Sequence, residues 1–233
     1  MTPAIAFQSI QKDIAETAQR CRRSSEEITL VAVSKNCTLE EMEAVWGAGC
    51  RNFGESRIQE ALPKIAQMQH PASWHFVGSL QTNKARKAAL SFSLIHSVDT
   101  LRLAQILSNR GLEIDRPISI LLEICLTQEV GKKGFSLEEL FRHWDALLCL
   151  PGICIEGLMT IAPLTSDKGL ISRCFSELYV LREQLSARKI ERHPLKHLSM
   201  GMSNDYKLAI AEGATLLRIG KSIFKNQKNI LDK

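Results

Sequence analysis

The sequence predicts a single-domain (β/α)8 barrel of the TIM type with one extra helix at its N-terminus. Short apolar, β-branched runs alternate with amphipathic segments eight times along the chain. The length of 233 residues is also one at which α/β barrels form a single unit. An open doubly wound sheet is the alternative, although no G-x-G-x-x-G follows the first apolar run, as such a sheet would favour.

The predicted elements follow in regular order. Apolar residues at helical spacing indicate the first helix over about 4–21, and the barrel then extends over about 28–226. Thr38 before Leu39-Glu40-Glu41 is typical of a helix start, and Gly49 of a helix end. We expect strands at 28–35, 50–54, 73–78, 93–98, 118–126, 153–161, 195–200 and 214–220. We expect helices at 38–48, 56–68, 82–90, 100–109, 136–148, 168–188, 203–211 and from Ser222 onward.

The composition excludes several classes of protein. The net charge of +5 and the aromatic content of 6% do not indicate a nucleic-acid-binding surface. The seven cysteines form no C-x-x-C pair and no zinc-like cluster, so we expect no metal site and a reducing, cytoplasmic location. No apolar run is long enough to span a membrane, and the N-terminus does not resemble a signal peptide. We expect one domain over residues 1–233, because no linker-like tract interrupts the pattern.

Active groups of a TIM barrel lie at the carboxyl ends of its strands, which directs attention to Lys35. This lysine closes the apolar run VAVSK. We expect partial burial there to lower the pKa of the amine, and the neutral amine then attacks an aldehyde. The alternative is a lysine that merely ends a strand and points to solvent.

The last two βα units predict a phosphate-binding site. The seventh strand leads into SMGMSND (199–205) and the eighth into RIGKS (218–222). TIM barrels often bind phosphate between these two loops, where glycine allows close backbone approach and serine donates hydroxyl groups. The alternative is a pair of ordinary βα turns.

Arg218 ends the last strand, so its guanidinium is expected at the barrel mouth. Sites for pyridoxal 5′-phosphate (PLP) carry an acid or an arginine at the pyridine nitrogen. Arginine does not release its proton, so it leaves that nitrogen unprotonated and the ring a poorer electron sink. The alternative is an ion pair across the top of the barrel.

Other polar residues have simpler explanations. His75 and His96 lie in apolar strands and are expected to be hydrogen-bonded core histidines. Glu123 and Glu156 lie within strands and are candidates to pair with inward cations such as Lys35. Cys37 is expected to be a packed thiol, and the basic segment NKARK (83–87) a solvated helix face.

Eight stretches taken together resemble the PLP homeostasis protein family, known as YggS-like proteins in bacteria. They are LVAVSK (30–35), FGE…QEAL (53–62), WHFVGSLQTNK (74–84), HSVD (96–99), KKGF (132–135), GLMTIAP (157–163), LSMGMSND (198–205) and EGATLLRIGKSIF (212–224). The resemblance implies a barrel related to the N-terminal domain of alanine racemase. It implies PLP as cofactor, an internal aldimine on Lys35 and Arg218 as the partner of the pyridine nitrogen. It also implies phosphate contacts by Ser199, Gly201, Gly220 and Lys221.

The chain departs from the family pattern at several positions. FGESRIQE stands where the family usually has FGENYVQE, so Ser56 and Arg57 replace an Asn and a Tyr. Ser79 stands in place of a second histidine, Lys221 in place of Thr or Ser, and Lys225 in place of glycine. These departures affect the expected contacts to the ring hydroxyl and the phosphate, but not Lys35 or Arg218.

The resemblance implies a cytoplasmic carrier or regulator of PLP rather than an enzyme, so no catalytic residue is assigned. One alternative is an amino-acid racemase, which needs a base on each face of its substrate. Barrel racemases take the second base from an added domain, and this chain ends nine residues after Phe224. A phosphate-binding barrel enzyme that does not use PLP is a further alternative. Expected partners are PLP and PLP-dependent apo-enzymes, without nucleic acid or membrane, and we expect a monomer.

Overall fold

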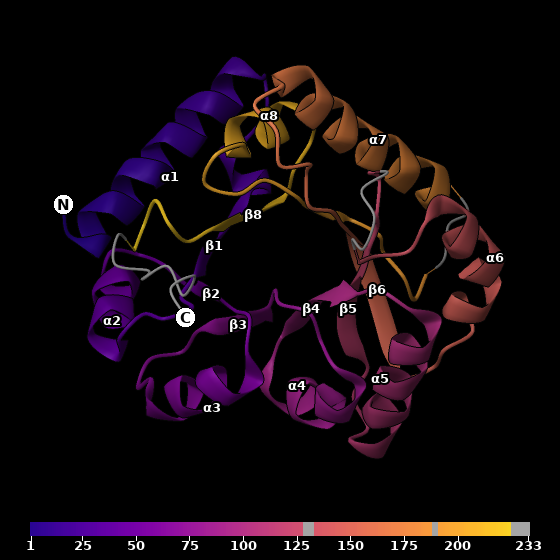
Figure 1. Ribbon diagram of the computed structural model, residues 1–233. Helices are drawn as coiled ribbons and strands as arrows, with labels where there is room; N and C mark the ends of the chain where they lie inside the picture. Colours follow the sequence, from indigo (N-terminus) through magenta and orange to yellow (C-terminus); the bar gives the residue numbers. More distant parts are fainter. Residues whose placement is uncertain (128–132, 188–190, 225–233) are drawn as a thin grey trace.

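The computed structural model is a closed barrel of eight parallel strands, and it describes residues 1–127, 133–187 and 191–224 (Figure 1). Each strand pairs with the next along the chain, and the last pairs with the first. The predicted (β/α)8 fold is therefore confirmed, and the open sheet is excluded. The strands are β1 (Thr29–Val33), β2 (Asn52–Glu55), β3 (Ser73–Phe76), β4 (Leu94–Val98), β5 (Ile118–Glu123), β6 (Ile153–Met159), β7 (His197–Ser199) and β8 (Leu216–Ile219).

The helices form a ring outside the strands (Figure 1). The extra helix α1 packs beside α2 and α8. Short 3-10 turns, η1 (Ser25–Glu27) and η2 (Thr82–Lys84), precede β1 and α4. The α-helices are α1 (Pro3–Arg20), α2 (Leu39–Gly47), α3 (Ile58–Gln67), α4 (Ala85–Ser91), α5 (Leu101–Glu113), α6 (Leu137–Leu148), α7 (Lys168–Ser186) and α8 (Tyr206–Ala211).

Local signals in the sequence explain most helix boundaries. Thr38 with Glu41 and Ser136 with Glu139 form capping boxes at the starts of α2 and α6. Several boundaries differ from the prediction: α5 continues to Glu113 beyond its expected end at 109, and α4 begins only at Ala85, after η2. Helix α8 begins only at Tyr206, because residues 200–205 form the loop after β7. Residues 221–223 form a turn closed on Gly220, and the rest of the predicted final helix lies outside the described residues.

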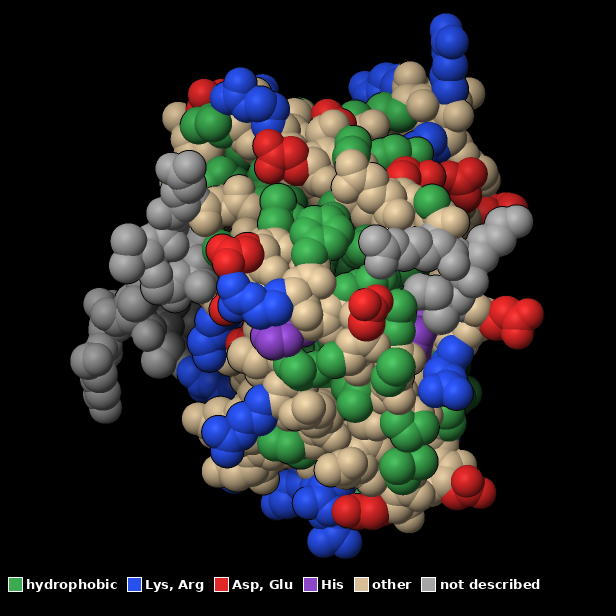
Figure 2. All heavy atoms as spheres, turned by 90° about the vertical axis from the view of Figure 1, so that its right-hand side faces the viewer, with side chains coloured by type: hydrophobic (Ala, Val, Ile, Leu, Met, Phe, Trp, Pro, Cys, Tyr) green, Lys and Arg blue, Asp and Glu red, His purple; other side chains and the backbone are tan. Residues whose placement is uncertain are grey.

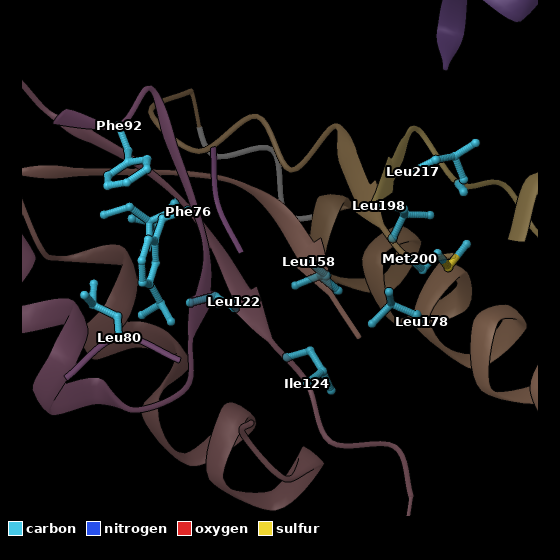
Figure 3. Packing of buried hydrophobic residues seen from close by; sticks show 14 of the residues in the cluster. Phe76, Leu80, Phe92, Leu122, Ile124, Leu158, Leu178, Leu198, Met200 and Leu217 are labelled. Atoms are coloured by element: carbon cyan, nitrogen blue, oxygen red, sulfur yellow. The ribbon is translucent and has the colours of Figure 1, made fainter. Parts of the chain in front are cut away.

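The alternation of side chains along the strands separates two cores. Outward residues pack against the helices, as Figure 3 shows for Leu158 of β6, Leu198 of β7 and Leu178 of α7. A smaller cluster lies apart from this layer and fills the interior of the barrel with Val31, Leu94, Leu121, Met159 and Leu216. The polar residues that share the inward faces of the strands therefore lie in a dry environment.

The outer surface is mixed in character. Figure 2 shows the side of the molecule that carries α6 and α7, where hydrophobic side chains lie among charged ones. Leu137 and Phe141 of α6 and Val180 of α7 are about half exposed. No described helix is long and apolar enough to cross a membrane.

Candidate cofactor site

Lys35 lies at the rim of the barrel, just beyond the carboxyl end of β1. The chain turns there through Asn36, whose φ of 60° is a left-handed conformation that asparagine tolerates. Lys35 is exposed, so the partial burial expected from the sequence is wrong. The reason is local, since β1 ends at Val33 and the turn carries the lysine above the packed interior.

The turn that carries Lys35 is held from below by a buried ion pair. Lys64 Nζ donates to the carbonyl oxygen of Ser34 and to Glu55 Oε1, each at 2.7 Å. Ser34 Oγ donates to the same carboxylate oxygen at 2.7 Å. Glu55 is fully buried, so these contacts fix the backbone immediately before Lys35.

Arg218 points into the barrel from β8, which pairs with β1 through Val31 and Arg218. The arginine is buried, with 6% of its surface exposed. Nη1 donates to Ser199 Oγ at 2.6 Å, and Nη2 donates to the carbonyl oxygen of Thr160 at 2.9 Å. The sequence predicted the guanidinium at the barrel mouth, and the structure places it deeper, buried inside the barrel against Ser199 and Thr160.

Two carboxyl groups face Arg218. Burial lowers the pKa of Arg218 to about 10, while Glu123 and Asp205 act to raise it. Burial raises the pKa of Glu123 to about 7, helped by Asp99 and opposed by Arg218 and Lys133. The cations that act on Glu123 are therefore Arg218 and Lys133, and not Lys35 as the sequence suggested. Glu156 instead pairs with Lys196 at 3.6 Å.

Ser199 lies inside the barrel. It is fully buried, and its Oγ contacts both Arg218 and His96 Nδ1, the latter at 2.8 Å. His96 Nε2 in turn lies 2.9 Å from His75 Nδ1, and His75 Nε2 lies 3.1 Å from Asn52 Oδ1. The two histidines are hydrogen-bonded core residues, as predicted, but their link to Arg218 was not foreseen.

The loops after β7 and β8 lie against each other. Ser222 N donates to Ser203 Oγ at 3.3 Å, and Arg218 N donates to the carbonyl oxygen of Gly201. Gly201 has a φ of 90°, and a Cβ there would lie 2.6 Å from Ala209 Cβ. Gly220 is buried and Lys221 is exposed at the same end of the barrel. Ser203, the second serine of the predicted phosphate-binding segment 199–205, joins the two loops.

A cavity of about 240 Å³ opens at the carboxyl ends of β3 to β6. Its lining includes Gly78, Ser79, Ser97, Glu123, Lys133 and Met159. Lys133 Nζ donates to Ser79 Oγ across this space. Ser79, which stands where the family pattern has a second histidine, therefore lines a cavity beside the interior that holds Arg218.

Comparison with known proteins identifies the family of this chain. Residues 5–227 match the family model described as alanine racemase, N-terminal domain. The pyridoxal phosphate homeostasis protein of Synechocystis is 43% identical over 84% of this chain and 90% of its own length. The protein of the same name from Escherichia coli is 36% identical over 92% of both chains.

Solved structures show the same relationship. PipY of Synechococcus elongatus, solved without PLP, has a TM-score of 0.82 and 37% identity, covering 91% of this chain and 99% of its own. PipY with PLP bound has a TM-score of 0.81 and 36% identity over the same shares of the two chains. Alanine racemase from Bartonella henselae, with a TM-score of 0.68 and 13% identity over 95% of this chain and 58% of its own, shares the fold. The chain therefore belongs to the alanine racemase N-terminal domain family and, within it, to the pyridoxal phosphate homeostasis proteins.

Proposed function

We propose that the chain binds PLP as a Schiff base on Lys35 and serves intracellular PLP homeostasis. The observation that carries the proposal is the exposed amine of Lys35 just beyond the end of β1. β1 pairs with β8, the strand that carries Arg218. An exposed lysine amine is accessible to an aldehyde. PipY, which has the same fold and 36% identity, has been solved with PLP bound.

The remaining residues at this end of the barrel fit the other parts of PLP. Arg218, whose two hydrogen bonds go to Ser199 and Thr160, is the candidate partner of the pyridine nitrogen. The backbone of Gly201, Gly220 and Lys221 supplies the phosphate contacts, because glycine permits close approach. Ser203 takes part with them, since its hydroxyl lies between the two loops. The hydroxyl of Ser199, predicted as a phosphate contact, is instead engaged by Arg218 and His96.

We further propose a carrier or regulator rather than an enzyme. PLP supplies an electron sink when its ring nitrogen is protonated. Arg218 donates hydrogen bonds and accepts none, so it leaves that nitrogen unprotonated. An amino-acid racemase is the alternative, because the fold is shared with alanine racemase. Sustained interconversion of D- and L-alanine at enzyme-like rates would contradict the carrier role.

The Schiff base is tested by the visible spectrum of the purified protein after addition of PLP. The parent protein is expected to show a yellow band that borohydride reduction converts into a stable adduct on Lys35, located by mass spectrometry of peptides. Lys35→Ala is expected to lack both. Lys12→Ala, which changes an exposed lysine of α1 paired with Glu16, is the matched control. An undiminished band in Lys35→Ala would refute the assignment.

The organisation of the protein in the cell is also a proposal. We propose a cytoplasmic, single-domain monomer that hands PLP to apo-enzymes. The large hydrophobic side chains on α6 and α7, such as Leu137, Phe141 and Val180, are only about half exposed, which supports a monomer. Light scattering of the PLP-loaded protein at increasing concentration tests this, and a constant dimer mass would overturn it.

A further inference from the structure

A continuous line of hydrogen bonds crosses the interior of the barrel and ends on Arg218. It links Asn52 of β2, His75 of β3, His96 of β4, Ser199 of β7 and Arg218 of β8. The successive contacts are 3.1, 2.9, 2.8 and 2.6 Å long. β4 and β7 are not neighbours in the sheet, so the bond from His96 to Ser199 passes through the interior.

The chemistry of the two ends determines the direction of every bond. A guanidinium only donates, so Ser199 Oγ accepts from Arg218. Its own proton is directed to His96 Nδ1 when that ring is neutral and carries its proton on Nε2. His96 Nδ1 is then an acceptor, and its proton lies on Nε2, which donates to His75 Nδ1. His75 likewise carries its proton on Nε2 and donates to Asn52 Oδ1, an amide oxygen that only accepts.

The surroundings of the histidines agree with neutral rings. His96 is completely buried and His75 nearly so, and burial lowers the pKa of both. Within the described residues, the charged or titratable groups that act on the pKa of these rings are Arg218, His197 and, for His96, also His75, and none of these is acidic. A proton added to His75 Nδ1 would place two donors face to face, because His96 Nε2 already donates to it, and this would remove one bond from the line.

An arginine at one end and an amide at the other make this line unsuited to moving protons. Neither group exchanges its proton in the course of ordinary acid–base chemistry. The line instead holds the guanidinium in one orientation. Nη1 is bound to Ser199 and Nη2 to the carbonyl of Thr160, so the plane of the group is fixed at two points.

We propose that Asn52, His75, His96 and Ser199 are positioning residues that orient Arg218 toward the cofactor ring through a one-directional hydrogen-bond chain with both imidazoles in the neutral Nε2–H form. The assignment of the ring as the target rests on the proposed PLP function. The direction of the hydrogen bonds and the tautomers do not, because they follow from Arg218, Asn52 and the neutral state of the two buried rings.

The tautomers are tested without PLP by nitrogen NMR of protein labelled at its six histidines. His75 and His96 are expected to show a protonated Nε2 and an unprotonated Nδ1 across a range from about pH 6 to 8. His193 is expected to give the same pattern, because its Nδ1 accepts from Ile155 N and its Nε2 donates to the carbonyl oxygen of Leu148. The single variants His75→Gln and His96→Gln assign the two signals. A proton on Nδ1 of either residue overturns the proposal, whether or not the protein binds PLP.

The positioning role is tested by PLP affinity in a double-mutant cycle. Ser199→Ala is expected to weaken PLP binding about fivefold and to shift the pH titration of the visible band, because Arg218 loses one restraint. In an Arg218→Lys background the same change is expected to alter PLP affinity less than about twofold, because the guanidinium that Ser199 orients is absent. Ser199→Cys, which keeps a small hydrogen-bonding group, is expected to restore part of the affinity.

Ser108→Ala is the matched control for this cycle. Ser108 is equally buried and accepts a hydrogen bond from Gly152 N, but it lies on α5 and takes no part in the hydrogen-bond chain that ends on Arg218. Equal effects of Ser199→Ala in both backgrounds would contradict positioning through Arg218. If the parent protein itself bound no PLP, the proposed function would fail, while the NMR result would still decide the hydrogen-bond chain.

Discussion

Glu55 Oε1 lies 2.7 Å from Lys64 Nζ in an ion pair beneath the turn that presents Lys35. The Glu55 side chain is fully buried and that of Lys64 is 15% exposed. Lys64 also binds the carbonyl of Ser34, so the pair connects α3 and β2 to the residue before the candidate Schiff-base lysine. If Lys35 forms the proposed Schiff base, we therefore expect stability and cofactor binding to be coupled at this point.

Replacing Lys64 by methionine is expected to destabilise the protein by about 3 kcal/mol, because the buried Glu55 carboxylate loses its cation. Adding Glu55→Gln is expected to recover part of this loss. Urea denaturation measures both. Lys207→Met removes a surface ion pair with Asp13 and is expected to cost less than about 1 kcal/mol. Equal costs for the two lysines would show that the buried pair contributes no more than the surface one.

The buried histidines are expected to make stability depend on pH. Burial lowers the pKa of His75 to about 4, against about 6.5 in an unfolded chain. Between these values the unfolded state binds a proton that the folded state does not, so the contribution of His75 is lost as pH falls from about 6.5 to 4. Glu123, whose pKa is raised to about 7, acts in the opposite direction.

A variant isolates the histidine contribution. Between about pH 7 and 5, the free energy of unfolding of the parent is expected to fall by about 2 kcal/mol more than that of His75→Gln. Chemical denaturation at both pH values measures this difference. His70→Gln, a change of an exposed histidine, controls for the substitution itself. Parallel pH profiles of the parent and His75→Gln would contradict a neutral His75.

Gly201→Ala is expected to lower both stability and PLP retention. The backbone there has a φ of 90°, and the added Cβ would meet Ala209 Cβ at 2.6 Å, so we expect a cost above about 1 kcal/mol. Gly47→Ala is the matched control. Gly47 is the last residue of α2, and the Cβ that this change adds would have no atom within 4 Å. Thermal unfolding and dialysis of the PLP-loaded proteins give the two readouts. An unaffected Gly201→Ala would remove the argument for a required glycine.

Ser203 and Ser199 are expected to differ in phosphate binding. Inorganic phosphate competes with PLP for the loops after β7 and β8, and Ser203→Ala is expected to weaken that competition about fivefold. The effect of Ser199→Ala on phosphate is expected to be smaller, because its hydroxyl is bound by Arg218 and His96. Titration of phosphate into the PLP-loaded variants measures both. The opposite ranking would restore the phosphate contact predicted for Ser199.

Much of the fold was predictable because strand and helix signals are local. Thr38 and Ser136 mark helix starts through capping contacts with residues only three positions further along the chain. The apolar runs match the eight strands. Lys35 and Arg218 were predictable as strand-end residues of a barrel. The exposure of Lys35 was not, because it depends on where β1 stops and on the left-handed Asn36.

The hydrogen-bond chain was hidden for a different reason. His96 and Ser199 lie far apart in sequence, on strands that do not pair, so no local pattern connects them. The signal present in the sequence was weaker: polar residues at inward positions of apolar strands, namely His75, His96 and Ser199. Such residues need partners when buried, and the barrel interior is where they find one another.

The closure of the barrel has a consequence for its biosynthesis. Thr29 of β1 pairs with Leu216 of β8. β1 is the first strand to leave the ribosome, so the edge of β1 that pairs with β8 stays unpaired until the last strand has been made. Nascent chains must keep that edge from pairing with other strands, and contacts between distant parts of a sequence form slowly. Lys35 follows β1 and Arg218 lies on β8, so we expect the proposed PLP site to form only when synthesis of the barrel is nearly complete.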